Sequence, residues 1–104
     1  ILVDDMVDTA GTITKAADIY EGKPEPFLSA PIASHCVMSG PASERVQDSG
    51  LEEMVFTDSI PYSNRCAKVK QLTIADMFAE TIRRVMNNES ISDRIYYLIS
   101  VDKR

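Results

Sequence analysis

Short apolar runs alternate along the chain with stretches of helical periodicity. The run Ile1–Val3 is wholly apolar and rich in branched residues, which is typical of a strand buried on both faces. From Thr12 the apolar positions recur at i, i+3, i+4 and i+7, the spacing of an amphipathic helix. The residues at these positions are Ile13, Ala16, Ala17 and Tyr20. Gly22 marks the predicted end of this helix.

The rest of the chain continues the alternation of strand and helix. Further strands are predicted over 32–39, 52–57 and 68–74. A short helix is predicted between the first two of these strands, with Pro41 near its first position and its end at Gly50. A capping box at 73–76 predicts the start of a longer helix that ends near 87–88. Its apolar face consists of Ile74, Met77, Phe78, Ile82, Val85 and Met86.

Strands that alternate with helices predict an α/β fold with a mainly parallel sheet flanked by helices. A length of 104 residues suits one domain, and we expect residues 1–104 to form it. Because the chain begins at Ile1, inside an apolar run and without a Met, we also expect it to be part of a longer protein.

Charge and composition narrow the range of partners. The formal charge of −5 and the pI near 4.7 argue against binding to nucleic acid or to an anionic membrane surface, because the field repels phosphate. No apolar run approaches the roughly 18 residues of a membrane span, and no signal peptide is evident. The two cysteines have neither a CxxC spacing nor a metal-ligand spacing, which favours reduced thiols in a cytoplasmic protein.

The acidic turn predicted after the first strand carries the candidate chemistry. Ligands of parallel α/β sheets bind beyond the carboxyl ends of the strands, where helix N-termini favour anions. Asp4 and Asp5 only accept hydrogen bonds, which suits a vicinal diol or a hydrated cation. Thr9, Gly11 and Thr12 offer hydroxyl and N–H groups to a phosphate. One ligand that carries both a phosphate and a cis-diol is a ribose 5-phosphate.

Other interpretations of this turn do not fit its spacing. An EF-hand loop that starts at Asp4 would lack the acceptor, the Gly and the Glu needed at its third, sixth and twelfth positions. Neither GxGxxG nor GxxxxGK[ST] occurs in the chain. A turn that only caps the helix would account for Asp8 or Thr12, but not for the adjacent pair Asp4 and Asp5.

The same residues carry a resemblance to a known family. The segment ILVDDMVDTAGT at 1–12 is similar to the phosphoribosyl-diphosphate motif of type I phosphoribosyltransferase-fold proteins. The segments SHCVMSGPASERVQDSGLEEMVFTDSIP at 34–61 and LTIADMFAETIRRVMNNESIS at 72–92 resemble the C-terminal domain of ribose-phosphate pyrophosphokinases. The motif indicates the fold, whereas SGPA, TDSIP and NNESIS, in that order, indicate the family. The segments 21–31 and 93–104 depart from the family pattern.

The resemblance implies an activity and a set of substrate-binding residues. Family members transfer the diphosphoryl group of ATP to O1 of ribose 5-phosphate, which yields phosphoribosyl pyrophosphate and AMP and requires Mg²⁺. The ribose hydroxyls would lie against Asp4 and Asp5. The residues implied for the 5-phosphate are Asp8, Thr9, Ala10, Gly11 and Thr12.

The resemblance also implies partners for this chain. The N-terminal half of the family enzyme carries the ATP-binding segments, so the chain would hold only the sugar-phosphate half of a site. Family members form hexamers with an effector site between subunits, in which Ser90 and Ser92 would take part. A non-catalytic relative, a phosphoribosyltransferase that consumes phosphoribosyl pyrophosphate, and a simple oligomerisation module remain alternatives.

Two further pairs of residues are expected to be structural. His35 and Cys36 are neighbours on a predicted strand, so their side chains point to opposite faces and do not form a thiolate–imidazole pair. Arg83 and Arg84 fall in the last turn of the long helix, where cations complement the helix dipole. The apolar run at 95–99 is expected to be a packing strand or a contact between subunits.

Overall fold

The computed structural model describes residues 2–20, 30–63 and 65–92, and the chain divides into a unit of Ile1–Thr73 and a unit of Ile74–Arg104. Most of the atypical segment 21–31 and all of 93–104, including the apolar run at 95–99, lie outside the described residues. The two units are described separately below, and a single domain over 1–104 stays a prediction.

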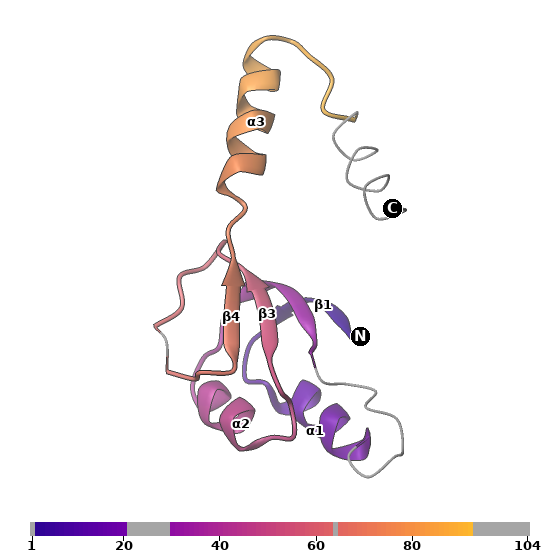
Figure 1. Ribbon diagram of the computed structural model, residues 1–104, viewed down its shortest axis with the longest axis vertical. Helices are drawn as coiled ribbons and strands as arrows, with labels where there is room; N and C mark the ends of the chain where they lie inside the picture. Colours follow the sequence, from indigo (N-terminus) through magenta and orange to yellow (C-terminus); the bar gives the residue numbers. More distant parts are fainter. Residues whose placement is uncertain (1, 21–29, 64, 93–104) are drawn as a thin grey trace. The chain divides into compact units, whose positions relative to one another are not determined.

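A four-stranded, wholly parallel sheet with the order β1-β2-β3-β4 forms the centre of the first unit (Figure 1). The strands are β1 (Val3–Val7), β2 (Ile32–Cys36), β3 (Met54–Thr57) and β4 (Val69–Leu72). The predicted α/β fold with a parallel sheet is confirmed. Each strand after the first lies within its predicted span and is shorter than predicted.

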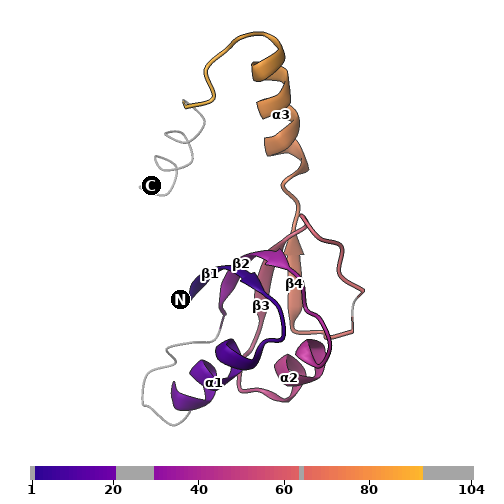
Figure 2. The ribbon, with the colours of Figure 1, turned by 180° about the vertical axis from the view of Figure 1, so that it is seen from behind.

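Two helices connect the first three strands, because parallel neighbours need a crossover connection. These helices are α1 (Gly11–Tyr20) and α2 (Ala42–Asp48), and they lie next to each other on the same side of the sheet (Figures 1 and 2). The structure places Pro41 at the N-cap of α2 and Ser49 at its C-cap, close to both predicted ends.

The core of this unit lies between the sheet and these two helices. Phe56 and Met54 of β3 are buried together with Leu51, which precedes the strand. α2 contributes Val46, which is also fully buried. The apolar stripe predicted for the first helix is confirmed at Ile13 and Ala17, both of which are buried.

The first strand differs from the prediction. β1 begins at Val3 and includes both Asp4 and Asp5, which therefore lie in a strand and not in a turn. The prediction that this strand is buried on both faces is wrong, since Val3 is 74% exposed and Met6 is 48% exposed. The physical reason is position: β1 is at the edge of the described sheet, where β2 is its only neighbour.

The second unit contains α3 (Ala75–Met86). Ile74 is the N-cap and makes no side-chain capping hydrogen bond, so the helix starts one residue later than the predicted capping box implies. No residue of α3 is buried, and its predicted apolar face is exposed at Met77, Phe78, Ile82, Val85 and Met86. Among the described residues, no helix has the length and apolar character needed to cross a membrane.

Candidate functional site

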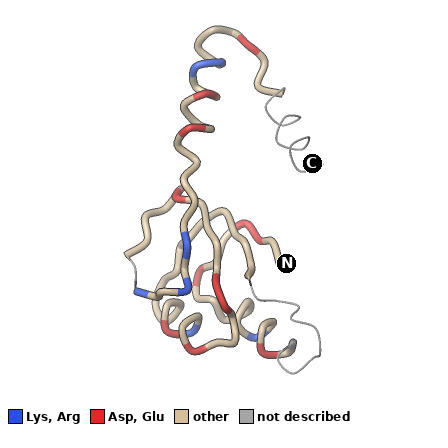
Figure 3. Tube along the Cα trace, in the orientation of Figure 1, with Lys and Arg blue, Asp and Glu red and all other residues tan. Residues whose placement is uncertain are grey.

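A cavity of about 160 Å³ lies where β1 ends and α1 begins. Its walls are formed by Asp4, Met6, Val7, Asp8, Thr9, Ala10, Gly11, Thr12 and Ile13. The structure thus brings together every residue predicted for the sugar phosphate except Asp5. Acidic residues occur in both units, and those of β1, Asp4 and Asp5, are close to the N-terminus in the sequence (Figure 3).

The loop between β1 and α1 is held by its carbonyl groups. Three consecutive carbonyl oxygens of this loop accept hydrogen bonds. The Asp8 carbonyl accepts the Ser39 N–H at 2.9 Å, and the Ala10 carbonyl accepts the Thr14 N–H at 3.1 Å. Between them, the Thr9 carbonyl accepts a hydrogen bond from Arg45 Nη1 at 3.0 Å. The described peptide bonds are all trans, so the N–H of each peptide unit points away from its carbonyl oxygen. The loop therefore turns a series of N–H groups away from these anchors.

Ala10 has the least common backbone conformation in this loop. Its φ is 61°, in the left-handed region, where an L residue costs about 1–2 kcal/mol. The hydroxyl of Thr14 donates a second hydrogen bond to the Ala10 carbonyl at 2.7 Å, which helps to hold this conformation. Left-handed residues of this kind form concave arrangements of N–H groups that bind anions.

The start of α1 extends this arrangement. The first N–H groups of a helix have no partner within the helix, and together with the helix dipole they favour an anion. α1 carries no acidic residue in its first turn. The carboxylate of Asp8, which lines the cavity, accepts a hydrogen bond from the Ser39 hydroxyl. The N-terminus of α1 is therefore suited to a phosphate.

The adjacent acids of β1 do not have the same surroundings. Asp4 lines the cavity, whereas Asp5 does not, because successive residues of a strand point to opposite faces. The Asp4 carboxylate accepts the Asp5 N–H at 2.8 Å, and the Asp5 carboxylate accepts the Met6 N–H at 2.7 Å. The bond from Met6, followed by the contact with the Asp4 side chain, lowers the pKa of Asp5. Both acids are exposed to solvent.

Arg45 is the residue near this site that sequence reasoning missed. It lies on α2, 36 residues from Thr9, and its guanidinium donates to the Thr9 carbonyl. Within the segment SGPASER it has no periodicity or motif that distinguishes it from any exposed helical arginine. Only the packing of α2 beside α1 brings it to the loop.

A second, larger cavity of about 440 Å³ lies between α1 and α2. Gly11 and Arg45 line it, together with the charged side chains of Lys15, Glu44 and Asp48. Gly11 lines both cavities. Arg45 lines the larger cavity and Asp4 lines the smaller one, so the loop lies between the two cavities.

His35 and Cys36 are separated as predicted. Cys36 is buried, and its burial raises the pKa of the thiol to about 11, so the thiol is protonated at neutral pH. His35 is exposed, and its Nδ1 shares a hydrogen bond of 2.7 Å with the Ser59 hydroxyl. Cys66 is also buried, and both cysteines are free thiols.

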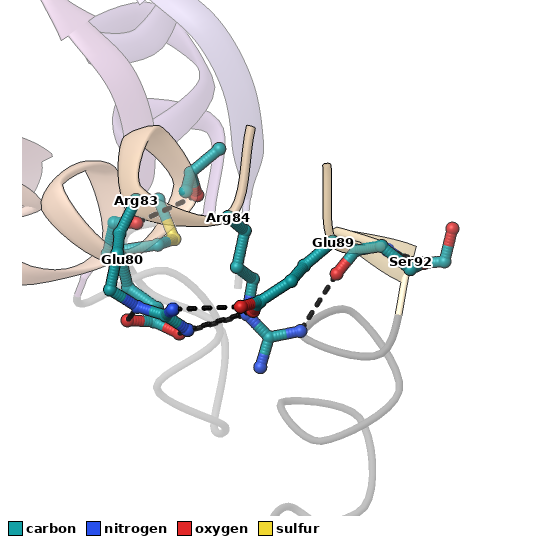
Figure 4. A network of polar contacts seen from close by, with 8 residues as sticks. Glu80, Arg83, Arg84, Glu89 and Ser92 are labelled. Carbon is teal, nitrogen blue, oxygen red and sulfur yellow. Dashed lines mark hydrogen bonds and ion pairs between the residues drawn. The ribbon is translucent and has the colours of Figure 1, made fainter. Parts of the chain in front are cut away.

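In the second unit, a network of charged side chains joins α3 to the residues that follow it (Figure 4). Glu80 pairs with both Arg83 and Arg84, each at 2.9 Å. Arg84 also donates to the carbonyl of Ser90 at 2.8 Å, and the Ser92 N–H donates to the Ser90 hydroxyl at 3.3 Å. The two arginines thus take part in specific ion pairs, and the effector role of the serines stays a prediction.

We expect this network to make the helicity of α3 depend on pH. Hydrogen bonds from Arg83 and then Arg84 lower the pKa of Glu80 from 4.5 to about 2. Because this pKa is lower in the folded state, the network stabilises fully above pH 4.5, and its contribution is lost as the pH falls toward 2. Far-ultraviolet circular dichroism should show wild-type helicity falling over this interval. Glu80→Gln should already have the lower helicity at neutral pH and lose less on acidification.

Glu52→Gln is the matched control, since it removes an exposed carboxylate outside α3. It should reproduce the wild-type profile. If Glu80→Gln also reproduces that profile, the network does not stabilise the helix.

The described residues do not form a metal cage. Over 2–20, 30–63 and 65–92, no group of three or more His, Cys, Asp and Glu side chains could hold a metal ion. Mg²⁺ often binds through one or two carboxylates, several waters and the substrate phosphates. The described side chains are therefore compatible with an Mg²⁺ ion that substrate phosphates also bind, but they do not form a complete metal site by themselves.

Comparisons with known proteins identify the family of the chain. Residues 1–96 match the family model described as "Phosphoribosyl synthetase-associated domain". A ribose-phosphate pyrophosphokinase from Porphyromonas gingivalis is 59% identical over 97 residues, which are 93% of this chain and 31% of that protein. One from Helicobacter hepaticus is 46% identical over 96 residues, 92% of this chain and 31% of that protein.

A solved structure supports the same assignment. The chain is similar to the crystal structure of phosphoribosylpyrophosphate synthetase from Mycobacterium smegmatis, with a TM-score of 0.76 and 34% sequence identity. The match covers 84% of this chain and 30% of the solved chain. The chain spans 31% of the length of each of the two curated relatives.

Proposed function

Because this chain belongs to the phosphoribosyl synthetase-associated domain family, we propose that it contributes the sugar-phosphate half of a ribose-phosphate pyrophosphokinase active site. The enzyme would transfer the diphosphoryl group of ATP to O1 of ribose 5-phosphate and release AMP. The observation that carries the proposal is the cavity in which Asp4 faces a loop whose consecutive carbonyls are all anchored.

The cavity offers complementary groups to the two ends of the sugar phosphate. The N–H groups of the loop and of the first turn of α1 would bind the 5-phosphate, with the Thr9 and Thr12 hydroxyls as further donors. Asp4 would accept hydrogen bonds from the ribose hydroxyls. That Asp5 shares this role stays a prediction, because its side chain is not in the cavity wall.

The chemistry proposed needs no nucleophilic side chain from this chain. Diphosphoryl transfer depends mostly on positioning the attacking oxygen and on neutralising charge. Binding of the 5-phosphate by the loop, together with hydrogen bonds from the ribose hydroxyls to Asp4, would fix the position of O1. The described residues therefore suit the task of orienting the acceptor.

The remaining parts of the site would come from outside this chain. We propose that the ATP-binding half belongs to the portion that relatives have beyond the matched span, and that Mg²⁺ reaches the site through the phosphates of the substrates. We also propose a homo-oligomer in the cytoplasm, with Ser90 and Ser92 near an effector. Analytical ultracentrifugation with and without phosphate addresses the assembly.

Ribose 5-phosphate should stabilise the chain against thermal unfolding, since a ligand that binds only the folded state raises its stability. The gain is about 2.7 kcal/mol at a ligand concentration about 100 times Kd. Asp4→Asn combined with Thr12→Val should abolish the gain, because it removes an acceptor for the hydroxyls and a donor to the phosphate. Differential scanning fluorimetry measures the shift.

Asp18→Asn is the control variant, since it removes a carboxylate of α1 outside the cavity and should keep the full shift. Asp5→Asn asks whether the second acid contributes. Full protection of the Asp4→Asn, Thr12→Val protein would contradict the proposed site.

A second candidate is a non-catalytic relative that keeps the fold and the sugar-phosphate cavity. AMP release after addition of a complementary ATP-binding half distinguishes the two. Labelled phosphoribosyl pyrophosphate, made or consumed, separates both from a phosphoribosyltransferase.

A further inference from the structure

We propose that Arg45 is a positioning residue that aims the Ala10 N–H at the phosphate of the bound ligand. The inference rests on the proposed function and adds to it a residue from outside the motif. Arg45 lies on α2, whereas all the residues of the proposed sugar-phosphate site lie on β1, on the loop or on α1. Arg45 is not part of the cavity wall, so it would act through the loop and not on the ligand directly.

The geometry of one peptide unit links Arg45 to the Ala10 N–H. Arg45 Nη1 donates to the Thr9 carbonyl oxygen at 3.0 Å. That oxygen and the Ala10 N–H belong to one trans peptide unit, so fixing the direction of the first fixes the opposite direction of the second. The carbonyls before and after it are held by backbone N–H groups. The Thr9 carbonyl is the one of the three that no backbone N–H holds, so a substitution of Arg45 can release the Thr9–Ala10 peptide.

The positive charge of Arg45 also acts on the Thr9–Ala10 peptide. A guanidinium bonded to a carbonyl polarises the peptide and strengthens its N–H as a donor, since hydrogen bonds in series reinforce one another. Within the part of the chain that the structure describes, Arg45 forms no ion pair at 4.0 Å or less, although Glu44 and Asp48 line the same cavity. Asp18 lines this cavity as well, and among the described residues none of these carboxylates pairs with the guanidinium that donates to the loop.

Gly11 shows how little room the guanidinium has. A Cβ built on Gly11 would lie 3.2 Å from Arg45 Nη1, closer than ordinary van der Waals contact. The other neighbour is the Thr9 hydroxyl at 3.9 Å. An alanine at this position would therefore require the guanidinium, which donates to the Thr9 carbonyl, to shift by a few tenths of an ångström. The two residues should be coupled.

The test titrates the chain with ribose 5-phosphate and with inorganic phosphate and follows the backbone amide resonances. Arg45→Ala should weaken both by roughly 10-fold, the loss expected for one charge-assisted hydrogen bond. It should also shift the amide nitrogen resonance of Ala10 before any ligand is added. Arg45→Gln keeps a donor without the charge and should show a smaller loss.

Lys15→Ala is the matched control. It removes a positive charge from the same cavity between the helices but contacts no loop carbonyl. It should leave the Ala10 resonance and both affinities unchanged. Ethylguanidinium added to Arg45→Ala should restore part of the affinity, which a general loss of stability would not allow.

A double-mutant cycle tests the coupling with Gly11. Gly11→Ala should weaken phosphate binding in the wild-type background and have little further effect in Arg45→Ala, because the same contact is already lost. Additive losses would show that Gly11 acts independently of Arg45.

The outcomes separate this inference from the proposed function. If the wild-type chain binds at the loop and Arg45→Ala binds equally well, the positioning role is overturned and the proposed function stands. If neither ligand shifts the loop amides of the wild-type chain, the proposed function fails, and the role of Arg45 fails with it. Should Arg45→Ala not fold, equal affinities of the Arg45→Gln and wild-type chains would overturn the role.

Discussion

Phe56→Ala should destabilise the first unit by about 3–5 kcal/mol, a large part of the total stability of a small domain. Phe56 is only 1% exposed and lies on β3, an inner strand of the described sheet, paired with Ala33 on β2 and Gln71 on β4. An alanine there loses the transfer free energy of the ring and leaves a void in the core between the sheet and the helices. Urea denaturation should show a much lower midpoint with a similar slope.

Phe78→Ala provides the matched control for this prediction. It makes the same chemical change on α3, where the phenylalanine is 54% exposed. Its effect should remain within about 0.5 kcal/mol, as for most surface substitutions. A loss as large as that of Phe56→Ala would show that the apolar face of α3 is buried in solution. An unchanged midpoint for Phe56→Ala would contradict the core described above.

Ala10→Val should both destabilise the loop and abolish binding of ribose 5-phosphate. Ala10 is 4% exposed with a φ of 61°, and a β-branched residue in that region is a genuine outlier. Overpacking adds about 1–3 kcal/mol to the backbone strain. We expect the backbone at position 10 of this variant to leave the left-handed region, which turns the N–H of that residue away from the ligand. Calorimetric titration and thermal unfolding measure the two effects.

Ala10→Gly is the informative control, since glycine adopts the left-handed conformation without steric cost. The relief of strain opposes the greater entropy of the unfolded chain, so stability should change by less than about 1 kcal/mol. Binding should be retained. If Ala10→Val binds as tightly as Ala10→Gly, the left-handed geometry is not needed for the phosphate site.

The order of the elements followed from local pattern. Periods of two and of 3.6 residues are set by the backbone geometry of each element, so the strands and helices could be assigned from neighbours in the chain. The loop between β1 and α1 was located in the same way, because its residues are contiguous in sequence. The exact ends of elements were less predictable, and α3 begins one residue later than the predicted cap implies.

The two acids show where local pattern fails. Adjacent carboxylates suggested a turn, but β1 continues through Asp4 and Asp5 because an edge strand tolerates exposed charged side chains. Once they lie in a strand, they point in opposite directions, and only Asp4 reaches the cavity. The strand ends at Val7 and not at the predicted Val3, and this difference decides which acid can contact a ligand.

Residues close together in the chain were enough to predict the α/β alternation, the parallel sheet and the position of the loop between β1 and α1. Tertiary structure alone decided that Ser39 and Arg45 hold the carbonyls of that loop, since Arg45 meets Thr9 only when α2 lies beside α1. The place of β1 at the edge of the described sheet decided its exposure. Contacts between distant residues depend on how elements come together, and that arrangement has no signature in the spacing of neighbouring residues.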